Sequence, residues 1–336
     1  MNFTPLDPQK RTDKSLVSSR KEETDFTELD EGIKNIGVTQ EEKDRMIQAL
    51  DIELQQIEQK LKGSEAEEAI YNTLRSYIGE DRVISSKEIP QILNDLPSRM
   101  KTGQYDFDSL SGGFGEENLV VISGPTGQGK TLLAQNITSW LAQEGHRSLW
   151  FSYELSLAEL LQRFNSFENK PEFYIPKNNT SNSMMWIERK IVESMAKYQT
   201  KFVFIDHTYY LLDKGHKKDN LAFEIGVIVR ELKLIARKYG IVIFLMHHTN
   251  KVEALEAPTI TDLRDSALVG NEADYVIMVW RKPFTTKPKQ MLMEGIQYTN
   301  DMLVCFVKNR FSGKLGTITL TCQNNNLKSA YATSIE

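Results

Sequence analysis

The sequence predicts an α/β fold in which a mostly parallel sheet is flanked by helices, preceded by a small helical N-terminal region. From residue 101 onward, short apolar runs alternate with amphipathic stretches of helical period. This alternation is typical of parallel strands joined by helical crossovers. We expect strands at 118–123, 148–152, 202–206, 241–246, 275–280, 302–307 and 316–320, with the last two as a hairpin at the sheet edge. The expected helices are 132–143, 157–167, 184–197 and 222–239.

The composition of the chain excludes several classes of protein. Its 336 residues are 40% hydrophobic, enough for a sizeable core, and its formal net charge of −5 gives no overall basic field. Cys305 and Cys322 lack metal-ligand spacing, so we expect core residues rather than a zinc site. No apolar run is long enough to span a membrane, and the N-terminus has no apolar signal core. We expect a cytoplasmic protein with no membrane partner.

The chain is expected to contain four regions. Residues 1–38 are polar, charged and without periodicity, which is typical of a disordered or flexible arm. Residues 39–80 form a predicted helical hairpin, whose narrow apolar seam packs either on its own chain or against another subunit. Residues 81–100 form a linker with a short helix near 87–93. Residues 101–336 form the α/β domain.

A glycine-rich loop lies between a predicted strand and a predicted helix. Residues 124–131 fit the pattern G-x-x-x-x-G-K-T in the strand–loop–helix context that this motif requires. We therefore expect a P-loop that binds ATP, in which Lys130 reaches the β- and γ-phosphates and Thr131 ligates Mg²⁺. The predicted nucleotide contacts are Gly124, Pro125, Thr126, Gly127, Gln128, Gly129, Lys130, Thr131 and Leu132.

Two carboxylates follow other predicted strands. Asp206 ends the apolar run 202–206, which is the usual place in a P-loop fold for an acid that holds Mg²⁺. His207 follows it where some P-loop proteins have a second acid, so the general base must come from elsewhere. Glu154, just after the strand 148–152, is the candidate, because a carboxylate there orients the attacking water.

Two further strand ends carry histidines and cations. His247 and His248 end the strand at 241–246, whose tip is expected to face the γ-phosphate, and we expect His247 to sense hydrolysis. Lys308 and Arg310 follow the strand at 302–307. Such a pair reaches a neighbouring subunit's site in some ATPases, as an arginine finger does, but from the residues alone two exposed cations on a hairpin are the more usual interpretation.

The order of these motifs resembles the motor domain of DnaB-type replicative helicases, which has a RecA-type P-loop core. The matching runs are TGQYDFDSLSGG at 102–113, FSYEL at 151–155, DLRDS at 262–266, AD at 273–274 and KNRFSG at 308–313. Asp206 falls on the family's magnesium-binding acid. The resemblance covers about residues 86–322, and the ordered set is far more specific than any single motif.

The resemblance implies an ATPase and helicase domain at 101–336 that moves along single-stranded DNA as a homo-oligomeric ring, with a hexamer as the expected form. It implies that ATP lies between subunits, with Lys308 and Arg310 supplied in catalysis by the neighbour, and that Arg281 lies against the nucleotide base. Loops after two strands contact DNA in this family; here their cations are Lys214, Lys217, Lys218 and Lys251. The linker helix near 87–93 docks on the next subunit.

Two departures from the family matter. DnaB proteins usually carry glutamine at the sensor position, whereas this chain has His247, as do phage primase–helicases and the related mitochondrial helicase. The N-terminal region is also too short and too polar for a DnaB N-terminal domain, and it lacks the cysteines of a primase zinc module. This region is where primase or other replication proteins would bind, but the family's own primase contacts cannot be carried over to it.

Two alternatives to a replicative helicase stay open at this point. One is a recombination or repair ATPase of the RecA/RadA kind, which forms filaments or rings without unwinding. The other is a DnaB-like adaptor whose ATP site only regulates assembly.

Overall fold

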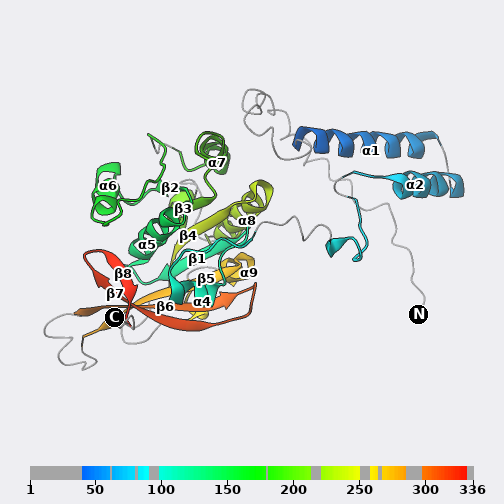
Figure 1. The fold of residues 1–336 in the computed structure, drawn as a ribbon. Coiled ribbons are helices and arrows are strands. Elements are labelled where there is room, and N and C mark those ends of the chain that lie inside the picture. Colours follow the sequence, from blue (N-terminus) through cyan, green and yellow to red (C-terminus); the bar gives the residue numbers. More distant parts are fainter. Residues whose placement is uncertain are drawn as a thin grey trace. The chain divides into compact units, whose positions relative to one another are not determined.

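The computed structural model describes residues 40–60, 63–79, 82–90, 98–178, 181–212, 221–249, 258–263, 267–284 and 297–330. The chain divides into two compact units, Met1–Ser86 and Lys87–Glu336. The second unit holds a sheet with helices on its faces (Figure 1).

The described part of the first unit is a pair of helices. α1 (Gln40–Lys60) and α2 (Ser64–Ser76) contact each other on either side of Gly63, whose φ of 68° is a left-handed conformation that glycine adopts without strain. The apolar seam predicted in residues 39–80 includes Leu54 and Ile57 of α1, which are half-buried, whereas no residue of α2 is buried. The apolar contact within the pair is therefore shallow. In the described parts of the chain, no helix has both the length and the apolar character needed to cross a membrane.

Eight strands form one sheet within the described residues of the second unit, which confirms the predicted α/β fold. The strand order is β2-β3-β4-β1-β5-β6-β7-β8; the first five of these are parallel, and β6, β7 and β8 are antiparallel to their neighbours. The strands are β1 (Leu119–Gly124), β2 (Ser148–Ser152), β3 (Phe202–Asp206), β4 (Val242–His248), β5 (Tyr275–Pro283), β6 (Tyr298–Asn309), β7 (Gly316–Gln323) and β8 (Asn326–Ser329).

The far end of the sheet differs from the sequence prediction. β6 and β7 form the expected hairpin, but they do not close the sheet, because β8 pairs with β7 and is the last strand. β8 contains a single apolar residue, Leu327, so hydropathy gives no strand signal there. Its place is fixed instead by burial of Leu327 and by a hydrogen bond from the Leu327 backbone N–H to the Asn136 side chain, at 2.8 Å.

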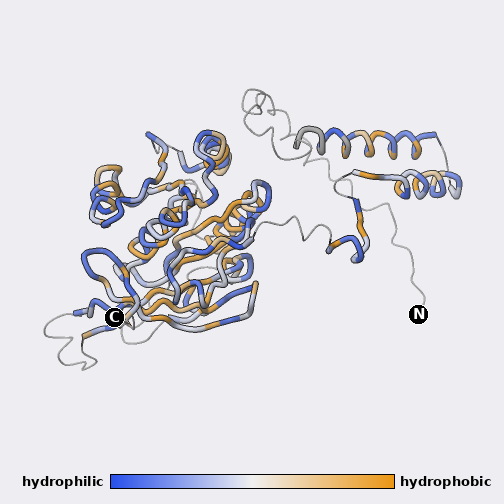
Figure 2. Tube along the Cα trace, in the orientation of Figure 1, coloured by the Kyte–Doolittle hydropathy of each residue, from blue (hydrophilic) through white to orange (hydrophobic). Residues whose placement is uncertain are grey.

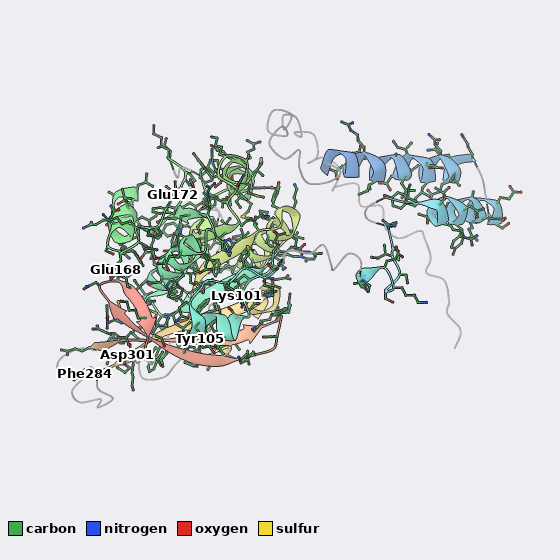
Figure 3. All side chains as sticks on the ribbon, viewed as in Figure 1. Lys101, Tyr105, Glu168, Glu172, Phe284 and Asp301 are labelled. Atoms are coloured by element: carbon green, nitrogen blue, oxygen red, sulfur yellow. The ribbon has the colours of Figure 1, made fainter. Side chains whose placement is uncertain are left out.

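Helices cover both faces of the sheet. α5 (Lys130–Gln143) and α6 (Leu157–Asn165) pack on one face, and α7 (Met184–Tyr198) and α8 (Leu221–Tyr239) pack on the other. Because side chains alternate along a strand, Phe244 belongs to the first core and Leu245 to the second. Burial on both faces explains why the parallel strands read as continuous apolar runs, which form the hydrophobic centre of this unit in Figure 2. Large apolar side chains such as Tyr105 and Phe284 are exposed at its surface (Figure 3).

The run at 102–113 forms a capped short helix, α4 (Tyr105–Ser111), at the entry to the sheet. The Asp108 carboxylate accepts hydrogen bonds from the backbone N–H groups of Thr102, at 3.0 Å, and Gly103, at 2.9 Å. Phe107 is fully buried and meets Phe306 of β6 edge-to-face, with ring centroids 5.1 Å apart. This run therefore fastens the start of the domain to β6.

An aromatic stack crosses three parallel strands on the α5 face. Trp150, Phe204 and Phe244 occupy matching positions of β2, β3 and β4. The ring centroids of Trp150 and Phe204 are 4.9 Å apart, and those of Phe204 and Phe244 are 4.7 Å apart, with interplanar angles of 9° and 6°. The central ring, Phe204, therefore has an aromatic neighbour on both sides.

We expect Phe204→Ala to lower the free energy of unfolding of the second unit by about 3–5 kcal/mol, because it opens a cavity between two buried rings. Urea denaturation followed by tryptophan fluorescence measures this change, since Trp150 lies in the stack. The matched control is Phe223→Ala on α8, where the side chain is 65% exposed and the expected change is within about 0.5 kcal/mol. Equal shifts in the two variants would contradict the role assigned to the stack.

Candidate functional site

The glycine-rich loop lies at the carboxyl end of β1 and leads into α5. Gly124, Gly127 and Gly129 have φ angles of 155°, 77° and 99°, conformations that side chains rarely adopt. A Cβ atom on Gly124 would lie 2.3 Å from the carbonyl oxygen of Val279 in β5. Gly129 is the N-cap of α5, so the first free N–H groups of this helix face the loop, as anion binding requires.

Lys130 is the first residue of α5, and its side chain folds back over the loop. Its Nζ donates to the carbonyl oxygens of Gly124, at 2.9 Å, and Pro125, at 3.1 Å. Only 7% of Lys130 is exposed, and this burial lowers the pKa of the ammonium to about 8 although Asp206 and Glu154 oppose the shift. A buried cation at this place favours an anionic ligand in the loop.

Thr131 at the start of α5 and Asp206 at the end of β3 bring two oxygen ligands together. The Thr131 hydroxyl donates to Asp206 Oδ2 at 2.7 Å. Asp206 is 1% exposed, and burial raises the pKa of its carboxyl to about 6, with a further increase from Glu154. Hydroxyl and carboxylate oxygens are ligands that Mg²⁺ accepts, and a divalent cation would offset the charge of this buried carboxylate. The two residues therefore fit a magnesium site.

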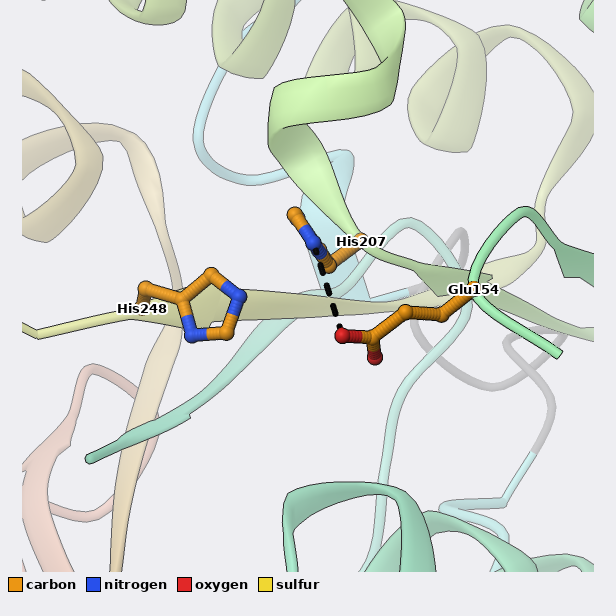
Figure 4. Close-up of side chains that lie close together, drawn as sticks. All are labelled: Glu154, His207 and His248. Atoms are coloured by element: carbon orange, nitrogen blue, oxygen red, sulfur yellow. Dashed lines mark ion pairs between the residues drawn. The ribbon is translucent and has the colours of Figure 1, made fainter. Parts of the chain in front are cut away.

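Glu154 lies beside Asp206 because β2 and β3 are neighbours. Ser152 pairs with Asp206 in the sheet, and the Tyr153 backbone N–H donates to the Asp206 carbonyl oxygen at 2.9 Å. The Glu154 side chain is 41% exposed, and its Oε1 lies 3.9 Å from His207 Nε2 (Figure 4). A carboxylate in this place can reach water near the phosphate loop.

His207 and His248 lie next to Glu154, although neither was assigned a role from the sequence. His207 is 7% exposed, and burial, with a contribution from Lys130, lowers the pKa of its imidazole to about 4, so the ring is neutral at neutral pH. The rings of His207 and His248 meet edge-to-face with centroids 4.3 Å apart. The sequence feature that could have identified His207 as a site residue is its position directly after Asp206.

The two histidines at the end of β4 point to opposite faces of the sheet. His247 is fully buried against η3 (Thr208–Leu211), where its Nδ1 lies 3.2 Å from Thr208 Oγ1 and its ring stacks on Tyr209 with centroids 5.9 Å apart. His248 lies on the other face, with Glu154. The structure therefore places His248, and not the expected sensor His247, beside the candidate base.

Arg281 lies at the end of β5, beside the phosphate loop. Its backbone N–H donates to the Gln128 side chain at 2.8 Å, and its guanidinium donates to the carbonyl oxygen of Thr299 at 2.9 Å. The guanidinium also lies 5.8 Å from the ring centre of Tyr298. Arg281 is thus brought to the rim of the loop by the pairing of β1 with β5.

Lys308 and Arg310 lie at the opposite end of the strands from the phosphate loop. Because β6 is antiparallel, these residues pair near the start of β5, whereas the phosphate loop follows the end of β1. Lys308 Nζ donates to the carbonyl oxygens of Gly270 and Asn271, at 2.6 and 3.0 Å. Arg310 donates to Asp274, at 3.2 Å, and to the Asn271 carbonyl, at 2.7 Å. Both side chains are held by α9 (Ala267–Glu272) and the residues after it, far from Lys130 of the same chain.

The expected DNA contacts Lys214, Lys217, Lys218 and Lys251 lie outside the described residues, as do residues 91–93 of the linker helix predicted near 87–93.

Comparison with known proteins identifies the domain. The model of the DnaB-like helicase C terminal domain matches residues 99–174 and 166–330. The chain belongs to this family. The "Probable replicative DNA helicase" of Trieres chinensis is 29% identical over 297 residues, covering 76% of this chain and 64% of that protein. The "Replicative DNA helicase DnaC" of Bacillus subtilis is 24% identical over 250 residues, covering 65% of this chain and 53% of that protein. The chain thus spans about half to two thirds of the length of these relatives.

Solved structures agree on the fold. A DnaB-like replicative helicase, whose structure was described together with its interactions with primase, superimposes with a TM-score of 0.59 at 17% identity, covering 86% of this chain and 77% of that one. A second structure, of an isolated ATPase domain, superimposes with a TM-score of 0.58 at 18% identity, covering 80% of this chain and 99% of that one. The resemblance drawn from the motif order is confirmed, and the domain is a nucleotide-binding P-loop unit.

The close approach of β1 and β5 makes Gly124 a test of the loop. We expect Gly124→Ala to weaken ATP binding by about 10-fold or more, because the added Cβ would clash with Val279 and the loop must shift to clear it, at a cost of at least ~1.4 kcal/mol. Titration with a fluorescent ATP analogue measures the affinity. The control is Gly145→Ala, where φ is 81° but no atom lies within 4 Å of the added Cβ. Unchanged affinity in Gly124→Ala would argue against nucleotide binding by this loop.

Proposed function

We propose that this chain is an ATP-driven DNA helicase that translocates on single-stranded DNA as a ring of six copies during DNA replication. Its membership of the DnaB-like family and the names of its relatives support this proposal. The observation that carries it is the separation of two groups of side chains on one sheet. Lys130, Asp206 and Glu154 meet at the carboxyl ends of the parallel strands, whereas Lys308 and Arg310 lie near the amino ends of those strands.

Each residue of the first group has a separate role in ATP hydrolysis. Lys130 exchanges its carbonyl partners in the loop for the β- and γ-phosphates and offsets their charge. Thr131 and Asp206 hold Mg²⁺, which when bound neutralises charge on the phosphates. Glu154 orients the attacking water and accepts its proton. Arg281 flanks the nucleotide base from the end of β5.

The second group acts on the nucleotide of a neighbouring copy. Carbonyl groups and Asp274 hold Lys308 and Arg310 at the end of the sheet that lies opposite to their own phosphate loop. In a ring, that end of the sheet in one copy faces the phosphate loop of the next copy. The two cations then offset the charge that develops on the transferred phosphate of the neighbour's nucleotide. The active site is complete only between two copies.

Hydrolysis is coupled to DNA through the ends of β3 and β4. His247 contacts Thr208, and the Thr208 hydroxyl donates to the Met246 carbonyl oxygen at 2.9 Å, so β4 is tied to η3 (Thr208–Leu211). The segments of the sequence that follow η3 and β4 carry Lys214, Lys217, Lys218 and Lys251. We assign single-strand contact to these four cations, which bind phosphates without reading the bases.

We expect the chain to displace an annealed strand from a forked DNA duplex in the presence of ATP and Mg²⁺. Lys130→Ala should abolish both displacement and hydrolysis, because the phosphates lose their counter-cation. A gel-based strand-displacement assay and a steady-state ATPase assay measure the two activities. Hydrolysis without displacement would favour a recombination ATPase, and binding without hydrolysis would favour an adaptor.

The shared site predicts that two inactive variants restore activity when mixed. Arg310→Ala should bind ATP and lose about 10³-fold or more in hydrolysis, the scale of an arginine finger's contribution. Lys130→Ala fails at the other side of the interface. Mixed rings contain some interfaces with an intact Lys130 from one copy and an intact Arg310 from the next, so ATPase activity should return in part.

The control for this experiment is a demonstration that subunits exchange, for example by energy transfer between labelled copies. Exchange without recovered ATPase activity would contradict the shared site, because a residue acting within its own chain gains nothing from mixing.

A further inference from the structure

The two histidines beside Glu154 have no task in the mechanism above. Glu154, His207 and His248 come from the ends of β2, β3 and β4, which are neighbours in the sheet. One nitrogen or oxygen atom of each lies within 4.8 Å of the others (Figure 4). The carboxylate belongs to a side chain that is 41% exposed, whereas the His207 side chain is 9% exposed. The Glu154 carboxylate is therefore free to change its rotamer, whereas the neighbouring His207 ring is buried.

Two kinds of chemistry suit such a cluster. Two imidazoles and a carboxylate with an open fourth position form a ligand set that binds zinc. Alternatively, an imidazole N–H donates a hydrogen bond to the carboxylate. The two differ in what they require of His207 Nε2: a metal needs its lone pair, whereas a hydrogen bond to Glu154 needs its proton.

The other ring nitrogen of His207 favours the hydrogen bond. The backbone N–H of Tyr209 donates to His207 Nδ1 at 3.3 Å, so Nδ1 is an acceptor and the proton of the neutral ring is on Nε2. His207 Nε2 is also the atom that faces Glu154 Oε1, at 3.9 Å. Zinc at Nε2 would move the proton to Nδ1 and set it against the Tyr209 N–H.

The His207 ring has little freedom to turn. The ring of His248 meets it with centroids 4.3 Å apart at 75°, and the ring of Tyr210 lies 4.9 Å away. Its Nε2–H therefore has a fixed direction. A hydrogen bond needs about 2.9 Å, so the exposed Glu154 side chain has to move by roughly 1 Å to make it.

We propose that His207 is a positioning residue for Glu154, to which its Nε2–H donates a hydrogen bond, with His248 packed behind the ring. The proposal rests on the assignment of Glu154 as the base in ATP hydrolysis. The bond holds one carboxylate oxygen, which leaves the other to accept the proton of the attacking water. His207 therefore affects the hydrolytic step and leaves nucleotide binding unchanged.

The experiment is a double-mutant cycle between His207 and Glu154. His207→Phe keeps a planar ring but removes the donor, and we expect kcat to fall by roughly 10-fold or more, as for loss of one charge-assisted hydrogen bond. The Kd for a non-hydrolysable ATP analogue should not change. His207→Gln, which keeps an N–H donor at a similar reach, should restore most of kcat. His146→Phe is the matched control, because His146 lies before β2, at the other end of that strand from Glu154, and contacts Phe202.

The decisive comparison is made in the Glu154→Gln background, where hydrolysis is expected to be about 10²-fold slower. If His207 acts through Glu154, His207→Phe causes no further loss there. An equal loss in both backgrounds would show a structural effect and overturn the proposal, while leaving Glu154 as the base. Wild-type hydrolysis by Glu154→Gln would overturn both assignments. Stoichiometric Zn²⁺ binding, measured by equilibrium dialysis in excess Mg²⁺ and lost in His207→Phe, would also overturn the hydrogen-bonded arrangement.

Discussion

The hydrogen bond between Thr131 and Asp206 orders the whole site. It joins the start of α5 to the end of β3 at 2.7 Å, although β4 lies between β3 and β1 in the sheet. The strand between them brings His247 and His248 to the level of Ser123 and Gly124. On the other side, Tyr153 donates to the Asp206 carbonyl, which brings Glu154 to the same edge. This contact, together with the pairing of the four parallel strands, brings their ends to the phosphate loop.

Burial gives this site its preference for charged ligands. It lowers the pKa of Lys130 to about 8 and raises the pKa of Asp206 to about 6, so the charged forms of both groups are less stable than in water. A phosphate beside Lys130 and a divalent cation beside Asp206 each replace the solvation that burial removed. The protein therefore carries the cost of these buried charges in its folded state, and binding of the ligand offsets it.

The sequence was most informative where burial and motif coincide. Residues 202–206 were predicted as a strand and form β3 with those bounds. A short apolar run between turns is typical of a strand that is buried on both faces of the sheet. β8 escaped prediction because Asn326–Ser329 is held by a side-chain contact to α5 and not by its own hydropathy. The choice between His247 and His248 depended on which face each takes at the end of β4. Adjacent residues of a strand face opposite ways, so only one of the two can lie beside Glu154, and the sensor role expected for His247 stays a prediction.

The length of β1 separates Lys308 and Arg310 from the phosphate loop of their own chain. Asp274, which holds Arg310, also accepts the backbone N–H of Leu119 at 2.8 Å and the ammonium of Lys233 at 2.7 Å. Leu119 begins β1 and Gly124 ends it, and every residue between them is buried. Five steps of about 3.3 Å separate the two by about 17 Å, more than an extended arginine side chain spans. Because a fully buried strand does not shorten, no change of rotamer brings Arg310 to the loop of its own chain. The cations either have no part in hydrolysis or act on another copy, and the second case requires a head-to-tail contact between copies, as in the proposed ring.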